Sequence, residues 1–128
     1  MKNGERAPKS NDRAWSPEKR KHPRYRIDLP IEYTRRDLVV RHDRAINASE
    51  GGLLAHFSEQ LEVGQYLRIK LFYPSCSAFN FIELVTQVVW MDVHAREDGR
   101  DCRTGVRVMD LSIEDLGDLK VFLASLSG

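Results

Sequence analysis

The stretch Arg26-Ile27-Asp28-Leu29-Pro30-Ile31-Glu32-Tyr33-Thr34 places an apolar side chain at every second position. A period of two is typical of a strand with one buried and one solvated face. Pro30 has no backbone N–H to donate, which favours an edge position or a bulge. The sequence therefore predicts a half-buried β-strand over residues 26–34.

Further short segments have strand character and are separated by turn residues; they cover 38–46, 52–57, 67–73, 79–91 and 104–109. The segment 67–73 alternates as clearly as the first strand. A polar turn at 96–99 separates the last two segments. Several short strands without helices between them indicate a mainly β fold, either a barrel or a sandwich.

The end of the chain changes to a helical period. Large apolar residues recur at spacings of three and four, and they are Ile113, Leu116, Leu119, Leu123 and Leu126. The run Ser112-Ile113-Glu114-Asp115 resembles a capping box at the start of a helix. The sequence therefore predicts one amphipathic C-terminal α-helix.

Composition sets the class of protein. The chain has 128 residues, 41% of them hydrophobic and 30% charged, which is typical of one globular domain. Residues 1–18 are polar apart from Trp15 and predict a flexible tail, followed by a domain over 19–128. No apolar run approaches a membrane span or a secretory signal, so we expect a cytoplasmic protein with Cys76 and Cys102 as free thiols.

A basic cluster precedes the first strand. Five cationic side chains occur within the eight residues from Lys19 to Arg26. Such a run is often only a solvated charge run at a domain boundary. Here Pro23 stiffens the segment and holds Arg20 and Arg24 apart, so that their two guanidinium groups can bind one ligand from different sides. A guanidinium binds phosphate, and also the O6 and N7 acceptors of guanine, in a bidentate manner.

A turn motif, Asn47-Ala48-Ser49-Glu50-Gly51-Gly52, separates two predicted strands. Asn, Ser and Gly are the residues that a tight turn needs, so the motif has an ordinary structural explanation. It also has a functional one, because Asn47 suits a base edge, Ser49 suits a phosphate and Gly52 leaves room for a ligand.

Together these two motifs resemble the signatures of the PilZ domain family, Arg-x-x-x-Arg and Asp/Asn-x-Ser-x-x-Gly. The resemblance extends from residue 19 to about 125 and implies a six-stranded antiparallel β-barrel followed by a C-terminal α-helix. It implies cyclic di-GMP as the ligand, with no cofactor. By position, the implied ligand-binding residues are Arg20, Arg24, Asn47, Ser49 and Gly52.

Two further residues follow from the same resemblance. Lys19 precedes the first arginine, where a basic residue in relatives accompanies a mutually intercalated ligand dimer; a lysine cannot stack or fork as an arginine does. Trp90 resembles a strand aromatic that borders the ligand, although a core or barrel-rim role explains it equally well. Asn47 stands where many members have Asp, which bears on affinity.

The expected function is a receptor that changes conformation on binding cyclic di-GMP. Because the predicted barrel uses nearly the whole chain, we expect the signal to pass to an unknown protein partner. A PilZ-like adaptor that binds proteins only is the first alternative. A small barrel that binds single-stranded nucleic acid is the second, but the net charge of +1 and the few aromatics among the cations do not favour a nucleic acid polymer.

No enzyme is expected. The histidines His22, His42, His56 and His94 occur singly, without the spacing of a metal site or of a nucleophile and its base.

Overall fold

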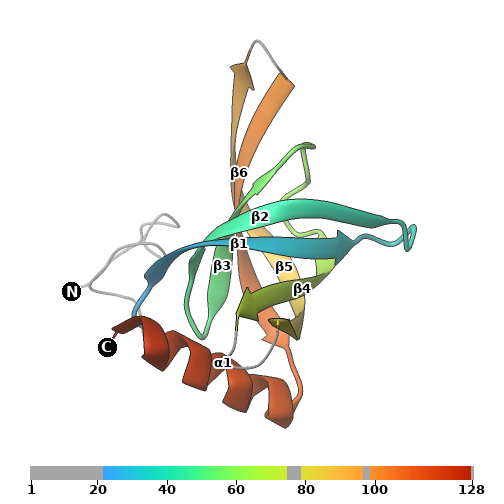
Figure 1. Cartoon of the computed structure of the whole chain (residues 1–128). Coiled ribbons are helices and arrows are strands. Elements are labelled where there is room, and N and C mark those ends of the chain that lie inside the picture. Colours follow the sequence, from blue (N-terminus) through green and yellow to red (C-terminus); the bar gives the residue numbers. More distant parts are fainter. Residues whose placement is uncertain (1–21, 75–78, 97–98, 128) are drawn as a thin grey trace, which may run out of the picture.

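The computed structural model describes residues 22–74, 79–96 and 99–127. Six antiparallel strands form a closed barrel in the order β1-β2-β3-β6-β5-β4 (Figure 1). The elements are β1 (Tyr25–Thr34), β2 (Val40–Ala48), β3 (Gly52–Phe57), β4 (Tyr66–Pro74), β5 (Phe79–Arg96), β6 (Gly99–Asp110) and α1 (Ile113–Ser127). The predicted six-stranded antiparallel barrel with a C-terminal helix is confirmed.

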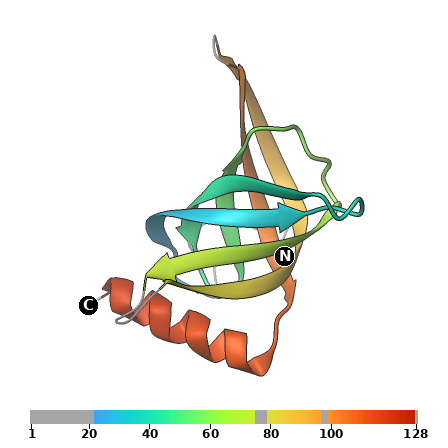
Figure 2. The same cartoon turned by 45° about the vertical axis from the view of Figure 1, so that its right-hand side comes forward.

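The last two strands are longer than predicted. They form a hairpin that projects from the barrel, as Figure 2 also shows. In this arm Asp92 stands opposite Arg103 and His94 opposite Asp101. Met91, Val93 and Ala95 alternate with polar residues, so the period-two pattern of β5 continues past the predicted end of the strand.

The second strand starts later than predicted. Leu38 lies in a turn with a φ of 62°, and its N–H donates to the Arg35 carbonyl over 3.2 Å. The strand begins at Val40. An apolar side chain in a left-handed turn cannot be told from a strand residue by hydropathy alone.

The inward faces of the strands fill the barrel. Ile31 and Tyr33 of the first stretch are buried, and the rings of Tyr33 and Phe57 meet edge to face with centroids 4.8 Å apart. Pairing of β1 with β4 begins at Ile31, so Pro30 lies just beyond that ladder and its missing N–H interrupts no bond to β4. Pro30 is paired with Arg44 of β2 and lies next to the register shift between Arg26 and Leu29, which is the bulge alternative of the prediction.

Helix α1 lies across the end of the barrel opposite the projecting hairpin (Figure 1). The Asp115 N–H donates to the Ser112 hydroxyl over 3.0 Å, which is the predicted cap. Leu119, Phe122 and Leu123 are buried, and Phe122 packs on Tyr73. The predicted apolar face was too wide, because Ile113 is 91% exposed and Leu126 is 40% exposed.

The predicted tail over 1–18 lies outside the described residues, and its boundary with the domain remains a prediction. Within the described part of the chain, no helix has the length and apolar character that crossing a membrane requires.

Replacing Leu119 by Ala should lower the free energy of unfolding by about 2–4 kcal/mol, because the change leaves a cavity between α1 and the barrel. Val121 on the same helix is 72% exposed, so Val121→Ala should change it by less than about 0.5 kcal/mol. Urea unfolding followed by circular dichroism measures both. Equal, small effects would show that α1 does not contribute to the core.

Candidate functional site

The two predicted motifs touch in the structure. Arg24 lies directly before β1, and its Nη1 donates to the Asn47 side-chain oxygen over 3.1 Å. The ladder between β1 and β2 places Tyr25 opposite Ala48 and Arg26 opposite Asn47. Pairing of the consecutive strands β1 and β2 thus brings Arg24 to the turn motif.

The turn itself is closed by its own backbone and by Ser49. The Ser49 N–H donates to the Gly52 carbonyl over 2.9 Å, and the Gly51 N–H donates to the Ser49 hydroxyl over 3.1 Å. A third bond, of 2.8 Å from the Val108 N–H to the Gly51 carbonyl, ties the turn to β6. Ser49 is 5% exposed, and its hydroxyl hydrogen remains available as a donor.

His22 lies over the same turn. Its Nδ1 is 4.0 Å from a carboxylate oxygen of Glu50, and its ring lies beside Gly51, where a Cβ would meet the ring at 3.4 Å. His22, which lies between the two motif arginines in the sequence, therefore contacts the turn. Lys19 and Arg20 themselves lie outside the described residues, so their predicted roles stay predictions.

Two strand irregularities aim the site residues outward. In β2 the register shifts between Ala45 and Asn47, so that buried Ala45 faces inward while Asn47 faces out. In β5 the register shifts between Val88 and Trp90, so that buried Val88 faces inward while Trp90 faces out. Without a bulge, residues two apart on a strand face the same side. Both bulges therefore move a functional candidate from the core to the outer wall.

Trp90 belongs to the outer wall and not to the buried core. It stands opposite Gly105, and a Cβ on Gly105 would lie 2.6 Å from Cε2 of the indole. The indole thus covers Gly105. Gly105 is in turn opposite Leu54, and Leu54 is opposite Asn47. One outward row connects Asn47 to Trp90 across four strands, and at about 4.8 Å per strand it is roughly 14 Å long.

Gly52 has a packing reason of its own. A Cβ at this position would collide with the Val106 carbonyl oxygen and approach Arg107 Cα to 3.3 Å. The close approach of β3 and β6 thus requires a glycine here. The ligand role predicted for Gly52 stays a prediction.

Arg107 is a site residue that the sequence did not reveal. It stands opposite Gly52 and is exposed, and its Nη2 donates to the Gln87 side-chain oxygen over 3.0 Å. Its position beside the turn follows from the β3–β6 register, which pairs strands about fifty residues apart. No local motif marks it, so only knowledge of strand order could have found it.

A second polar region lies at the other end of β1. Glu59 accepts hydrogen bonds of 2.7 Å from both Tyr33 and Arg35. Burial, reinforced by the bond to Glu59, raises the pKa of Tyr33 far above its ordinary value, so the phenol keeps its proton and donates it. This network fixes the β3–β4 loop against the β1–β2 hairpin.

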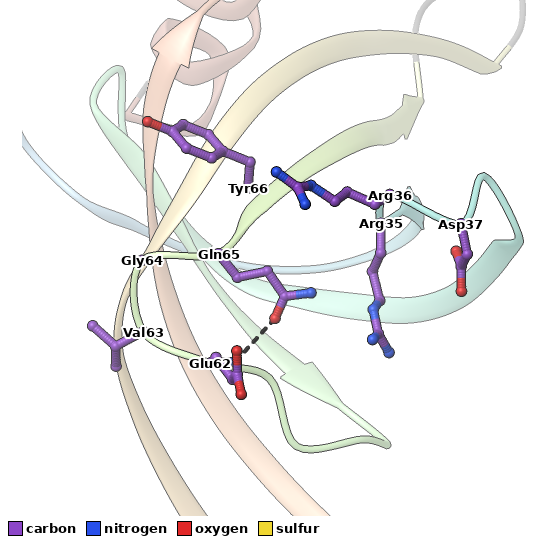
Figure 3. A pocket seen from close by; sticks show the side chains of 8 residues that line it. All are labelled: Arg35, Arg36, Asp37, Glu62, Val63, Gly64, Gln65 and Tyr66. Atoms are coloured by element: carbon purple, nitrogen blue, oxygen red, sulfur yellow. Dashed lines mark hydrogen bonds between the residues drawn. The ribbon is translucent and has the colours of Figure 1, made fainter.

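Beside that network lies a pocket of about 630 Å³ (Figure 3). It is bounded by residues 35–37 of the β1–β2 hairpin and by residues 62–66, at the end of the β3–β4 loop and the start of β4. Arg36 extends across it toward Tyr66. Gln65 accepts the Glu62 N–H over 3.0 Å. We call this pocket the hairpin groove. It does not contain the predicted site residues, and among the described residues no cluster could hold a metal ion.

Comparison with solved structures supports the fold. The PilZ domain of Escherichia coli YcgR with c-di-GMP has a TM-score of 0.66 and 15% identity, over 85% of this chain and 92% of that one. Bacillus subtilis MotI/DgrA, an inhibitor of motility, has a TM-score of 0.65 and 16% identity, over 81% of this chain and 48% of that one. The MrkH complex with c-di-GMP from K. pneumoniae has a TM-score of 0.63 and 14% identity, over 85% of this chain and 52% of that one.

The chain thus spans about half the length of MotI and MrkH and nearly all of the YcgR domain. No curated protein matches the chain. The family model for the PilZ domain matches residues 18–125, which include both motifs and every strand. The chain therefore belongs to the PilZ domain family.

Proposed function

We propose that this protein is a receptor for cyclic di-GMP that binds the nucleotide on the outer barrel wall and signals through a protein partner. The contact between Arg24 and Asn47 carries the proposal, because it joins the arginine motif to the turn motif at one place. Solved PilZ structures of YcgR and MrkH contain c-di-GMP, which is the same ligand chemistry.

Each residue has a chemical role in the proposed complex. The guanidinium groups of Arg20 and Arg24 bind phosphate and the guanine edge, while Asn47 meets a base through its amide. Ser49 donates its hydroxyl hydrogen to a phosphate oxygen. Arg107 adds a cation beside Gly52, and Trp90 offers its indole face to a guanine.

Local charge explains why a dianion binds a nearly neutral protein. The net charge is only +1, yet Arg24, Arg26 and Arg107 surround the turn, with Glu50 as the acidic residue of the motif. Binding would neutralise these cations and fix the segment that carries Arg20 and Arg24 against the turn. The resulting surface is what a partner protein would recognise.

Arg24→Ala should weaken binding of cyclic di-GMP about 10- to 100-fold, because one bidentate contact contributes roughly 1–3 kcal/mol. Arg24→Lys should recover little of this, since a lysine keeps the charge but lacks the fork. Isothermal titration calorimetry measures both. Arg68→Ala is the matched control, because Arg68 is exposed on β4 and pairs with Glu83.

Two outcomes of this titration would contradict the proposal. Equal affinity for the wild type and the Arg24 variants would remove the assigned site. Similar affinity for GTP, cyclic AMP or a salt-sensitive oligonucleotide would instead favour a general nucleic acid or anion surface.

The presence of Lys19 leads to a prediction of how many cyclic di-GMP molecules bind per chain. If it supports an intercalated ligand dimer, calorimetry on the wild type should give two cyclic di-GMP molecules per chain. Lys19→Ala should then reduce the number toward one, because the second nucleotide loses a cation. A single ligand per wild-type chain would exclude the dimer.

The proposed contact of Trp90 with the ligand predicts a change in tryptophan fluorescence. The chain has two tryptophans, so a Trp15→Phe variant emits from Trp90 alone. Saturating cyclic di-GMP should quench this emission, because a guanine would stack on the indole. Gly105→Ala should reduce the quenching, since its Cβ would displace the indole. Unchanged emission in a sample that binds ligand by calorimetry would place Trp90 outside the site.

A further inference from the structure

A second outward row runs from the turn motif to the hairpin groove. Gly52 stands opposite Arg107, Arg107 opposite Gln87, and Gln87 opposite Tyr66. Two side-chain bonds follow this row. Arg107 Nη2 donates to Gln87 Oε1 over 3.0 Å, and Gln87 Nε2 donates to the Gly64 carbonyl over 3.2 Å. The amide of Gln87 thus joins the proposed nucleotide site to a backbone carbonyl of the groove.

The partner of Arg107 is a neutral amide, which makes the contact exchangeable. A guanidinium is attracted more strongly to an anionic oxygen than to a neutral one, because both partners then carry charge. A phosphate placed beside Gly52 would therefore compete successfully for Arg107. A carboxylate in place of the amide would hold the guanidinium against such a competitor. Gln87 would then lose its charged donor whenever a nucleotide occupies the site.

The loop between β3 and β4 is anchored at its first part by side chains and at its last part by hydrogen bonds to β5. Glu59 and buried Leu61 anchor its first part. Its last part is attached to β5 by the Gly64 N–H to the Val88 carbonyl and the Val88 N–H to the Gln65 carbonyl, both 2.8 Å, besides the Gln87 contact. Loss of that contact affects the segment 62–65, which lines the groove.

We propose that Arg107 and Gln87 couple the nucleotide site to the hairpin groove. When cyclic di-GMP binds, Arg107 turns from Gln87 to a phosphate, Gln87 releases the Gly64 carbonyl, and residues 62–65 loosen. This inference rests on the proposed function, and it assigns the groove as the place where nucleotide binding changes the surface. Gln87 is a positioning residue, since it acts through Arg107 and not on the ligand.

Hydrogen exchange of the Gly64 and Val88 amides, measured by NMR, tests the coupling. Saturating cyclic di-GMP should speed exchange at both amides about two- to tenfold, as expected for loss of one exposed hydrogen bond nearby. In Gln87→Ala both amides should already exchange at the faster rate without ligand, and ligand should add no further change. Unchanged or slower exchange at both amides in the saturated wild type would overturn the coupling.

A second arm separates this inference from the proposed function, because it needs no ligand. Arg107→Ala should by itself speed exchange at Gly64 about two- to tenfold, since Gln87 loses its donor. Arg103→Ala is the matched control, an exposed arginine on the same strand that stands opposite Asp92, and it should leave Gly64 unchanged. If Gly64 exchange is the same in the Arg107→Ala variant and the wild type, the relay is wrong even where calorimetry shows nucleotide binding. If the relay holds but calorimetry shows no binding, the proposed function fails alone.

Discussion

The alternation of side chains along each strand is the constraint on which this structure depends. The inside of the closed barrel is filled, so a residue that meets a ligand must face outward. Regular alternation would turn Asn47 and Trp90 inward, because Ala45 and Val88 face the core. One register shift in each strand reverses this, and the two shifted residues end on the same outward row. The candidate site therefore exists because two bulges occur at matching positions.

Two glycines lie in the floor of that site, beside Leu54. Gly52 is imposed by the backbone of β6, and Gly105 is covered by the Trp90 indole. Cations stand at the rim, with Arg24 at one end of the wall and Arg107 beside the turn. A row about 14 Å long, with one tryptophan and a few arginines, suits a ligand of limited size. A polymer of single-stranded nucleic acid would use a longer path of alternating aromatics and cations.

Local patterns determined what could be predicted. Period-two alternation identified β1 and β4, and the spacing of Leu119 and Leu123 with the Ser112 cap identified α1. The prediction ended β5 too early, although Met91 and Val93 continue its alternation and Val93 stands opposite buried Cys102. For the site, both motifs were visible as local sequence, and their contact follows from the pairing of β1 with β2. The position of Arg107 could not be predicted, because it depends on the register between β3 and β6, which are distant in sequence. The bulges lie between consecutive strands, but no residue pattern in the sequence marks a register shift.

Closure of the barrel also limits how one end of the molecule can influence the other. All six strands are joined in a closed ladder around a close-packed core, and such an interior resists gradual deformation. At the far end of β1, Glu59 binds Tyr33 and Arg35, and the raised pKa keeps the phenol protonated as a donor to Glu59. This hydrogen-bond network lies away from the proposed nucleotide site, so a ligand bound there would not compete for its bonds. In the proposed receptor, a signal would therefore travel through contacts that a ligand can exchange. Such a contact lies on the outer wall, where the Gln87 amide accepts a hydrogen bond from Arg107 beside the turn.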